Sequence, residues 1–380
     1  MVRSDFHNLD EESFFDRVKA EVSEKMPNLS QTLNMAVIGK VSAGKSSLIN
    51  ALLKLSRKEA HDLKINVGAV SGVTKQLNIL KLDEKVCLID SPGLDDVIKE
   101  NSEVTKKFLE HIDVGIFVVT GSSDASQKKS LDDLRKHCDE IFVVLNKIDQ
   151  WDDLDPSALD EIAEQWKRDL AISKIYRTCA KGYDPKSVAP NMDIRGVVAL
   201  RSDVEKFLEK KGKDLLLARH MAEKQSYAIK IIATALVAVV VAAFLPGSAA
   251  SITSAQVVAI VCLYYLYTGE ILSSNAALAV LPTVLSQNVG TSLFLLVKSF
   301  VPPTGVLDVA AAGVAVVITI ALLSAVNYVL SIGARLDEEE LLRSKYRTYQ
   351  AKAATTLNEL ALTSVKDLPS WVEIVTKFLK

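Results

Sequence analysis

One short stretch of the sequence has the residue types and spacing of a phosphate-binding loop. Residues 39–46 fit the pattern G-x-x-x-x-G-K-[S/T], between an apolar run and an apolar helical pattern. Gly44 lets the backbone approach phosphate, and the loop N–H groups and the following helix N-terminus suit a polyanion. Lys45 can reach the β- and γ-phosphates, and the Ser46 hydroxyl can bind Mg²⁺. A chance glycine turn is the alternative; the nucleotide-site interpretation selects Gly39, Val41, Ser42, Ala43, Gly44, Lys45, Ser46 and Ser47.

Two further motifs, each after an apolar run, can complete such a site. In Asp90-Ser-Pro-Gly93 the carboxylate can hold a Mg²⁺-bound water, and the Gly93 N–H can sense a γ-phosphate. In Asn146-Lys147-Ile148-Asp149 the Asp149 carboxylate can accept two hydrogen bonds, from N1–H and the 2-amino group of guanine. Adenine offers no such pair of donors, so Asp149 favours GTP over ATP.

The remaining site residues come from a loop and from the end of a later strand. The backbone N–H groups of Cys179, Ala180 and Lys181 can meet guanine O6. Thr74 lies in a long loop and can close on Mg²⁺ when a γ-phosphate is present, although Ser71 is a nearby alternative. Each short motif is weak by itself, and their order and spacing together make the prediction.

An alternation of strands and helices must position these motifs. Continuous apolar strands separated by helical patterns, such as Gln127–His137 and Pro156–Leu170, predict an α/β domain with a mainly parallel sheet covered on both faces. Ligands bind beyond the carboxyl ends of such strands, where the motifs fall. The expected strands are Met35–Ile38, Gln76–Leu82, Val86–Ile89, Val114–Thr120, Ile141–Leu145 and Ile175–Arg177.

Over about 34–211 the chain resembles P-loop GTPases of the translation-factor and dynamin-related class. The stretch GKVSAGKSSLINALL is most similar to Era-like and bacterial dynamin-like members. The resemblance implies GTP/GDP and Mg²⁺ as ligands, with 55–75 and 91–103 as switch loops. It implies Lys45 on the phosphates, Ser46, Thr74 and Asp90 at the metal, and Asp149 on guanine. Cys179 replaces the more usual serine, a mild departure because the backbone reads the base.

The resemblance also indicates that the usual water-orienting glutamine side chains are absent. Leu94 stands where Ras-like enzymes carry a water-orienting glutamine, and Val41 stands where dynamins carry one. Ser42 occupies the position at which related enzymes help to hold a monovalent cation. We therefore expect slow hydrolysis, on the order of 10⁻⁴ to 10⁻² per second, stimulated by nucleotide-dependent dimerisation and self-assembly, with K⁺ as a candidate ion. The expected catalytic residues are Lys45, Ser42 and Thr74.

Length and charge indicate two domains with different chemistry. The 380 residues carry 45 basic and 47 acidic side chains, so no basic surplus points to nucleic acid. Between 231 and 334 the charged residues are Glu270, Lys298 and Asp308. Four dispersed cysteines favour a reducing setting. The expected division is an N-terminal helical segment 1–33, a GTP-binding domain 34–211, a linker helix 212–227, an apolar helical region 228–334 and C-terminal helices 335–380.

The apolar region predicts membrane association. Its runs are Ile229–Leu245, Gln256–Leu272, Ala276–Val301 and Val306–Ile332. The first spans about 26 Å, marginal for a hydrocarbon core of about 30 Å, and the last is long enough. Basic flanks favour an even number of crossings with the GTPase domain and both termini cytosolic. A buried soluble bundle is the alternative. The region is weakly similar to the YcjF-type apolar domain.

Amphipathic helices flank these parts. Phe14, Val18, Val22 and Met26 form one apolar stripe, and a seam from Leu342 onward forms another that could pack on it. The leading interpretation is a membrane-associated GTPase, dynamin-like or regulatory, whose switch loops act through the flanking helices on a lipid membrane. The alternatives are a soluble oligomer resembling immunity-related GTPases, or a GTP-dependent switch that recruits a protein partner.

Overall fold

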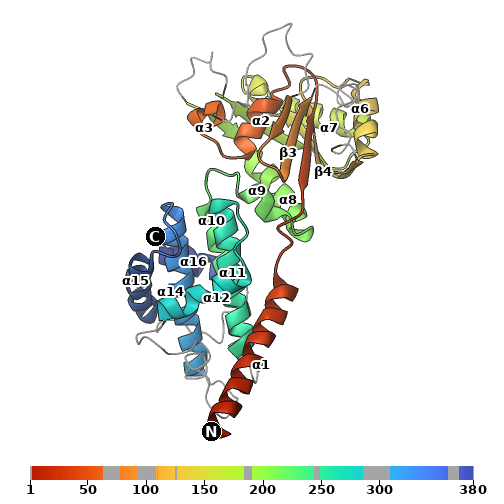
Figure 1. The fold of residues 1–380 in the computed structure, drawn as a ribbon. Coiled ribbons are helices and arrows are strands. Elements are labelled where there is room, and N and C mark those ends of the chain that lie inside the picture. The colour runs from red at the N-terminus through yellow and green to blue at the C-terminus, as the bar shows by residue number, and fades with distance from the viewer. Residues whose placement is uncertain are drawn as a thin grey trace. The chain divides into compact units, whose positions relative to one another are not determined.

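The chain forms two compact units in the computed structural model (Figure 1). The sheet unit is Asn28–Glu223, and the helical unit combines Met1–Pro27 with Lys224–Lys380. Along the sequence, the sheet unit is therefore an insertion in the helical unit. The finer divisions expected from the sequence stay predictions. The structure describes residues 2–62, 78–91, 108, 110–124, 126–183, 191–243, 249–285, 309–357 and 368–379.

The sheet unit contains a seven-stranded sheet in the order β2-β3-β1-β4-β5-β6-β7. The neighbours from β3 to β6 pair in parallel, and β2 and β7 pair antiparallel at the two edges. The expected mainly parallel α/β fold is confirmed. The strands are β1 Leu33–Ile38, β2 Asn78–Lys81, β3 Val86–Ser91, β4 Ile112–Val119, β5 Cys138–Asn146, β6 Tyr176–Lys181 and β7 Asp193–Arg195.

Helices cover both faces of this sheet because successive strand residues point to opposite sides. Phe117 and Val143 lie in a buried cluster with Trp166, whose indole N–H donates to the Gly121 carbonyl (2.8 Å). Phe142, which alternates with Val143, instead stacks edge-on with Phe207 on the other face. The described helices between and after the strands are α2 Lys45–Leu52, α3 Arg57–Asp62, α6 Ser126–Arg135, η1 Ile148–Trp151, α7 Pro156–Leu170, α8 Val197–Lys210 and α9 Asp214–Ala218.

Three described helices of the helical unit are long and apolar enough to cross a membrane by length and composition. They contain Gln225–Ala242, Ala249–Thr268 and Gly313–Ser331, and Ser274–Val284 is a shorter apolar segment. Part of the predicted third run and the start of the fourth lie outside the described residues. The helices are α1 Val2–Lys25, α10 Gln225–Ala243, α11 Ala249–Thr268, α12 Ser274–Leu285, α14 Val309–Ser331, α15 Glu339–Leu357 and α16 Leu368–Leu379.

An amphipathic helix packs against each of the three long apolar helices. α1 lies along α11, α15 along α14, and α16 against α10. Phe14, Val18 and Val22 are buried, as their spacing predicts, and so are Leu342 and Tyr346 of the seam in α15. The expected packing of the α1 stripe against the α15 seam is wrong, because α1 packs against α11 and α15 packs against α14.

A buried arginine joins the first helix of the sheet unit to the last long one. Arg201 of α8 donates from Nε to the Leu52 carbonyl (2.8 Å) and from Nη2 to the Ala51 carbonyl (2.6 Å). These carbonyls belong to the last turn of α2, where a helix leaves its C=O groups unpaired and favours a cation. The backbone N–H of Ala222, near the end of the unit, also donates to Leu53.

Replacing Arg201 with Met should destabilise α2. Met retains much of the volume but removes a charged donor from both carbonyls. The Ala51 carbonyl keeps the Lys54 N–H as a donor (3.2 Å), so the opening free energy of α2 should fall by about 1–3 kcal/mol. Native-state hydrogen exchange of the α2 amides measures it. Lys206→Met on the exposed side of α8 is the control and should change it by less than about 0.5 kcal/mol. Equal exchange in both variants would contradict the assignment.

Candidate nucleotide site

The glycine-rich loop leaves β1 between the ends of its two neighbouring strands. The Gly39 N–H donates to the Ser91 carbonyl at the end of β3 (3.3 Å). A Cβ atom at Gly39 would lie 2.2 Å from the Val118 carbonyl oxygen of β4. Only glycine fits at position 39, because the atoms next to it are the backbone carbonyls of Ser91 and Val118, which cannot move aside as a side chain can. The loop is thus fixed at the carboxyl edge of the sheet, where the sequence predicted a ligand.

Backbone conformation also fits the role predicted for this loop. Gly44 has φ +83°, and a Cβ there would lie 2.5 Å from Nδ2 of Asn146. Ser42 has φ +66°, an uncommon conformation for a residue with a side chain. Val41 and Ser42 are exposed, Ala43 is buried, and Ser47 is half-buried. The loop therefore has an exposed turn at Val41 and Ser42, followed by the buried Ala43.

Three side chains at the start of α2 and the end of β3 converge. Ser46 Oγ donates to Asp90 Oδ2 (2.6 Å), and Lys45 Nζ lies 3.7 Å from Asp90 Oδ1. Lys45 Nζ also donates to the Lys40 carbonyl (3.2 Å). Burial lowers the pKa of Lys45, and the adjacent Asp90 opposes that shift. A hydroxyl beside a carboxylate is oxygen-donor chemistry suited to Mg²⁺, which takes few protein ligands when phosphates supply the rest.

Asn146 connects the phosphate loop to the last parallel strand. Its Nδ2 donates to the Ala43 carbonyl (2.9 Å), and its Oδ1 accepts from Thr178 Oγ1 (3.0 Å). Lys147 follows in the left-handed conformation, with φ +63°. Asn146 therefore links the phosphate loop to β6 through its side-chain amide. The sequence motif by itself did not predict this link. Thr178, next to the predicted Cys179, was missed as part of this network.

Asp149 lies beside the strand end predicted to read the base. Lys181 Nζ is 3.2 Å from Asp149 Oδ2, and Cys179 Sγ is 3.5 Å from Asp149 Oδ1. Burial raises the pKa of the Cys179 thiol to about 11, so it is neutral at pH 7. A hydrogen bond from Lys181 to Asp149 raises the pKa of that lysine. Ala180 between them is buried.

Two predicted site residues, Thr74 and Gly93, lie outside the described residues, as does most of both expected switch loops. One neighbour of the site was missed by the sequence analysis. Lys40 forms an ion pair with Asp124, which follows β4, and both side chains are exposed. The hydrogen bond from Lys40 lowers the pKa of Asp124 to about 2. No motif links residues so far apart, so the pair was not predictable.

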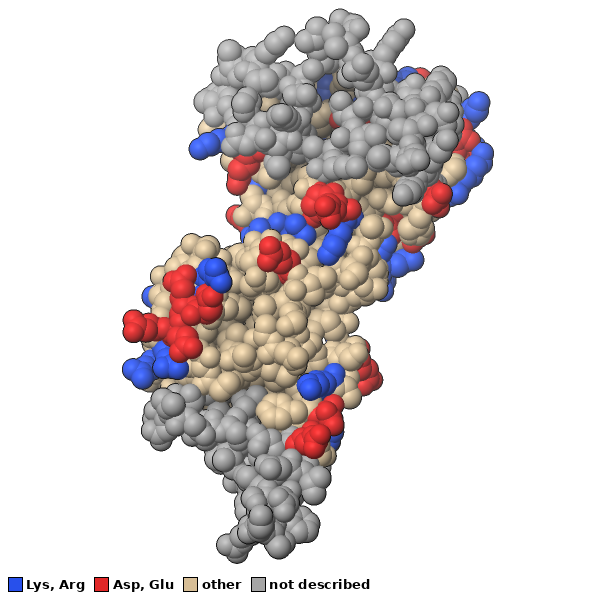
Figure 2. Space-filling model, in the orientation of Figure 1, with Lys and Arg blue, Asp and Glu red and all other residues tan. Residues whose placement is uncertain are grey.

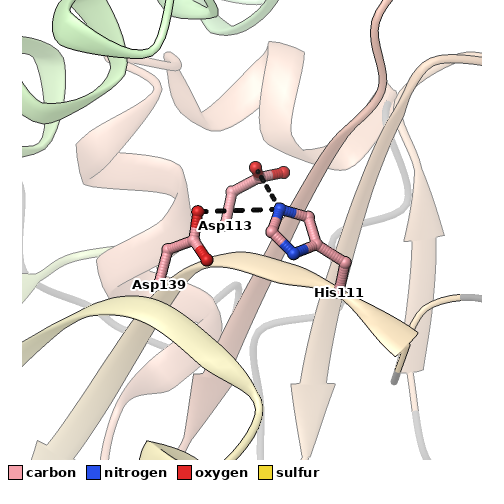
Figure 3. Close-up of side chains that lie close together, drawn as sticks. All are labelled: His111, Asp113 and Asp139. Atoms are coloured by element: carbon pink, nitrogen blue, oxygen red, sulfur yellow. Dashed lines mark hydrogen bonds and ion pairs between the residues drawn. The ribbon is translucent and has the colours of Figure 1, made fainter.

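His111, Asp113 and Asp139 cluster at the opposite edge of the sheet, where β4 and β5 begin (Figure 3). His111 Nε2 is 3.1 Å from Asp113 Oδ1 and 3.6 Å from Asp139 Oδ2. However, Lys213 Nζ lies 2.5 Å from the same Asp113 oxygen, and Lys211 Nζ lies 3.0 Å from the same Asp139 oxygen. Two ammonium groups already neutralise the carboxylates. We interpret the cluster as an ion-pair network rather than a metal centre.

Comparisons with known proteins agree with this geometry. Residues 34–147 match the family model described as 50S ribosome-binding GTPase. GTPase Der of a Nitratiruptor species is 29% identical over 185 residues, which cover 46% of this chain and 38% of Der. The tRNA modification GTPase MnmE of the same organism is 29% identical over 156 residues, covering 39% of this chain and 34% of MnmE. The chain thus spans little more than a third of these relatives.

Among solved structures, the G domain of the T. maritima FeoB iron transporter aligns with 47% of this chain at 17% identity and a TM-score of 0.27. That similarity is too low to support an argument. The family match, the sheet order and the loop at the end of β1 define the sheet unit as a P-loop GTPase domain. The resemblance inferred from the sequence is confirmed at this level.

Gly39→Ala should weaken nucleotide binding by roughly 10- to 100-fold, because the new methyl group meets a fixed carbonyl of β4 and must displace the loop. Equilibrium binding of a fluorescent guanine nucleotide measures the change. Gly121→Ala is a matched control: its φ is +64°, yet nothing lies within 4 Å of the added Cβ. Its cost is conformational, and nucleotide affinity should stay unchanged. A Gly39→Ala protein with normal affinity would show that the close approach does not shape the site.

Proposed function

We propose that this chain is a membrane-associated GTPase that binds GTP with Mg²⁺ and hydrolyses it to GDP. The convergence of Lys45, Ser46 and Asp90 beneath the glycine-rich loop carries the proposal. In it, Lys45 contacts the β- and γ-phosphates, and loop N–H groups from Val41 to Ser47 hold the polyanion. Ser46 and Thr74 would hold Mg²⁺, with the Asp90 carboxylate beside Ser46. Mg²⁺ supplies neutralisation of the developing phosphate charge.

Guanine would be read on the other side of the loop. Asp149 accepts from N1–H and the 2-amino group, and the backbone N–H groups of Cys179, Ala180 and Lys181 face O6. In the described geometry Lys181 occupies one Asp149 oxygen, so guanine must share or displace this exposed ammonium group. Asn146 and Lys147 keep the base side and the phosphate side together. GTP and GDP are the ligands proposed.

Hydrolysis would be slow in the isolated protein. Neither Leu94 nor Val41 can orient water, so transition-state stabilisation falls to Lys45, Ser42 and Thr74. We propose that dimerisation across the nucleotide face raises the rate, with K⁺ near Ser42. Thr74 and Gly93 would contact the γ-phosphate side of the bound nucleotide and would lose those contacts on hydrolysis, as in GTPase switches in general.

The output would be at a membrane. α10, α11 and α14 have the length and composition of spanning helices, with mean hydropathy of 1.8, 1.7 and 2.2 in their apolar windows. In the view of Figure 2, charged residues of the helical unit gather over α1 and over α15, with an uncharged surface between them. A YcjF-type domain acting in a dynamin-like or Era-like manner fits these features. Both termini and the GTPase domain would be cytosolic.

A second candidate function is a soluble GTPase that oligomerises or recruits a protein partner when loaded with GTP. One observation favours it: charged amphipathic helices pack along α11 and α14. An outer layer of that kind suits water rather than lipid.

Asp149→Asn should weaken GTP binding by roughly 10²- to 10⁴-fold, because two charge-assisted hydrogen bonds are lost. The same variant should gain affinity for xanthosine triphosphate, whose 2-oxo group can accept from the new amide. Competition binding measures both affinities. Asp152→Asn serves as the control, since Asp152 is exposed and pairs with Arg195. Unchanged GTP affinity in the Asp149 variant would refute the specificity assignment.

Membrane attachment is tested by lysis of cells without detergent, followed by washing of the membrane pellet in high salt and alkaline carbonate. Retention of the full chain in the pellet is the expected result, because spanning helices resist both treatments. Complete release into the supernatant would favour the soluble candidate.

A further inference from the structure

α11 is apolar on every side and buried on nearly every side. Its 20 residues carry no charge, and 72% of its apolar window is buried. Ala259, Ile260 and Val261 are at most 3% exposed, although successive residues point about 100° apart around the helix. A helix of this kind is either a protein core or a membrane span. At 1.5 Å per residue it is about 30 Å long, the thickness of a bilayer core.

The surface of α11 is covered in part by α1. Phe14, Val18 and Val22 recur every fourth residue and form one buried face of α1, at 8%, 0% and 1% exposure. Polar side chains from the two helices meet near the start of α11. Ser251 Oγ donates to Glu21 Oε1 (2.9 Å), and Ser254 Oγ donates to Glu21 Oε2 (3.0 Å). Lys25 Nζ contacts both Glu21 (2.6 Å) and Ser254 (3.1 Å).

The opposite side of α1 is charged and exposed to solvent. Asp16, Arg17, Lys19 and Glu24 are exposed there. Charged side chains are strongly disfavoured within a bilayer unless they face protein or water. α11 therefore cannot span a bilayer while α1 remains packed along it. The described packing is a water-compatible state, and a membrane-inserted state requires α1 to leave α11.

We propose that the face of α11 beneath α1 is a lipid-binding surface, covered by α1 in water and exposed to the bilayer when α1 detaches. This inference rests on the proposed action at a membrane. The length and all-round apolar character of α11 favour the hydrocarbon of a bilayer over a protein partner as its occupant. Glu21 adds polar contacts to this apolar packing, because it accepts hydrogen bonds from Ser251 and Ser254 of α11.

Locking the cover tests the proposal. Glu21→Cys with Ser251→Cys, in a chain carrying Cys87→Ser and Cys138→Ser, can be joined by a short bis-maleimide reagent. The remaining cysteines, Cys179 and Cys262, are buried. Flotation with vesicles of phosphatidylcholine and phosphatidylglycerol measures binding before and after joining, and GTP binding is checked in both samples.

We expect the unjoined protein to float with the vesicles and the joined protein to stay behind. Equal flotation of both would overturn the covered-surface proposal and leave action at a membrane intact. Flotation of neither would overturn both.

Loosening the cover gives an independent measurement without cross-linking. Glu21→Ala removes the acceptor of both serine hydrogen bonds and should raise the vesicle-bound fraction, at subsaturating lipid, by roughly 5- to 30-fold. Glu24→Ala makes the same change of charge at an exposed position of α1 and should bind like the unaltered chain. If both variants bind alike, net charge rather than release of α1 controls lipid binding, and the proposal fails.

Discussion

The nucleotide site depends on β1 being hydrogen-bonded on both sides. β1 pairs with β3 on one side and β4 on the other, and all three run parallel. The loop that leaves β1 therefore emerges between two strand ends, with the Val118 carbonyl on one side and the Ser91 carbonyl on the other. Lys45, Ser46 and Asp90 come together because their elements start or end at this same edge. A different strand order would separate the same motifs.

The sequence predicted the parts of this domain that depend on local pattern. The phosphate loop is contiguous, and the apolar strands differ from the observed strands mainly at their ends. β7 was missed because its residues, Asp193 to Arg195, are mostly polar and form a short antiparallel edge. Arg195 there bonds to Asp152, a contact between distant charged residues that no spacing rule indicates. Lys40 with Asp124 was missed for the same reason.

The helical unit shows a different limit. Four-residue spacing predicted the buried face of α1 but not its partner, because an apolar face fits any apolar surface. Magnitudes indicate what this packing can do. Burying Phe14, Val18 and Val22 contributes about 1.5–3 kcal/mol each, enough to hold α1 on α11 in water. Placing Asp16, Arg17 and Lys19 at bilayer depth would cost about 2.5–3.5 kcal/mol each, which offsets that gain.

The insertion of the sheet unit between α1 and the rest of the helical unit has a consequence for biosynthesis. Glu21 and its partner Ser251 are separated by 230 residues. At translation rates of about 5–20 residues per second, α1 leaves the ribosome roughly 10–50 s before α11 is made. During that interval its apolar face is open to chaperones and membranes, while the GTPase domain behind it can already fold. The ribosome thus makes α1 before it makes α11, the helix whose surface α1 covers.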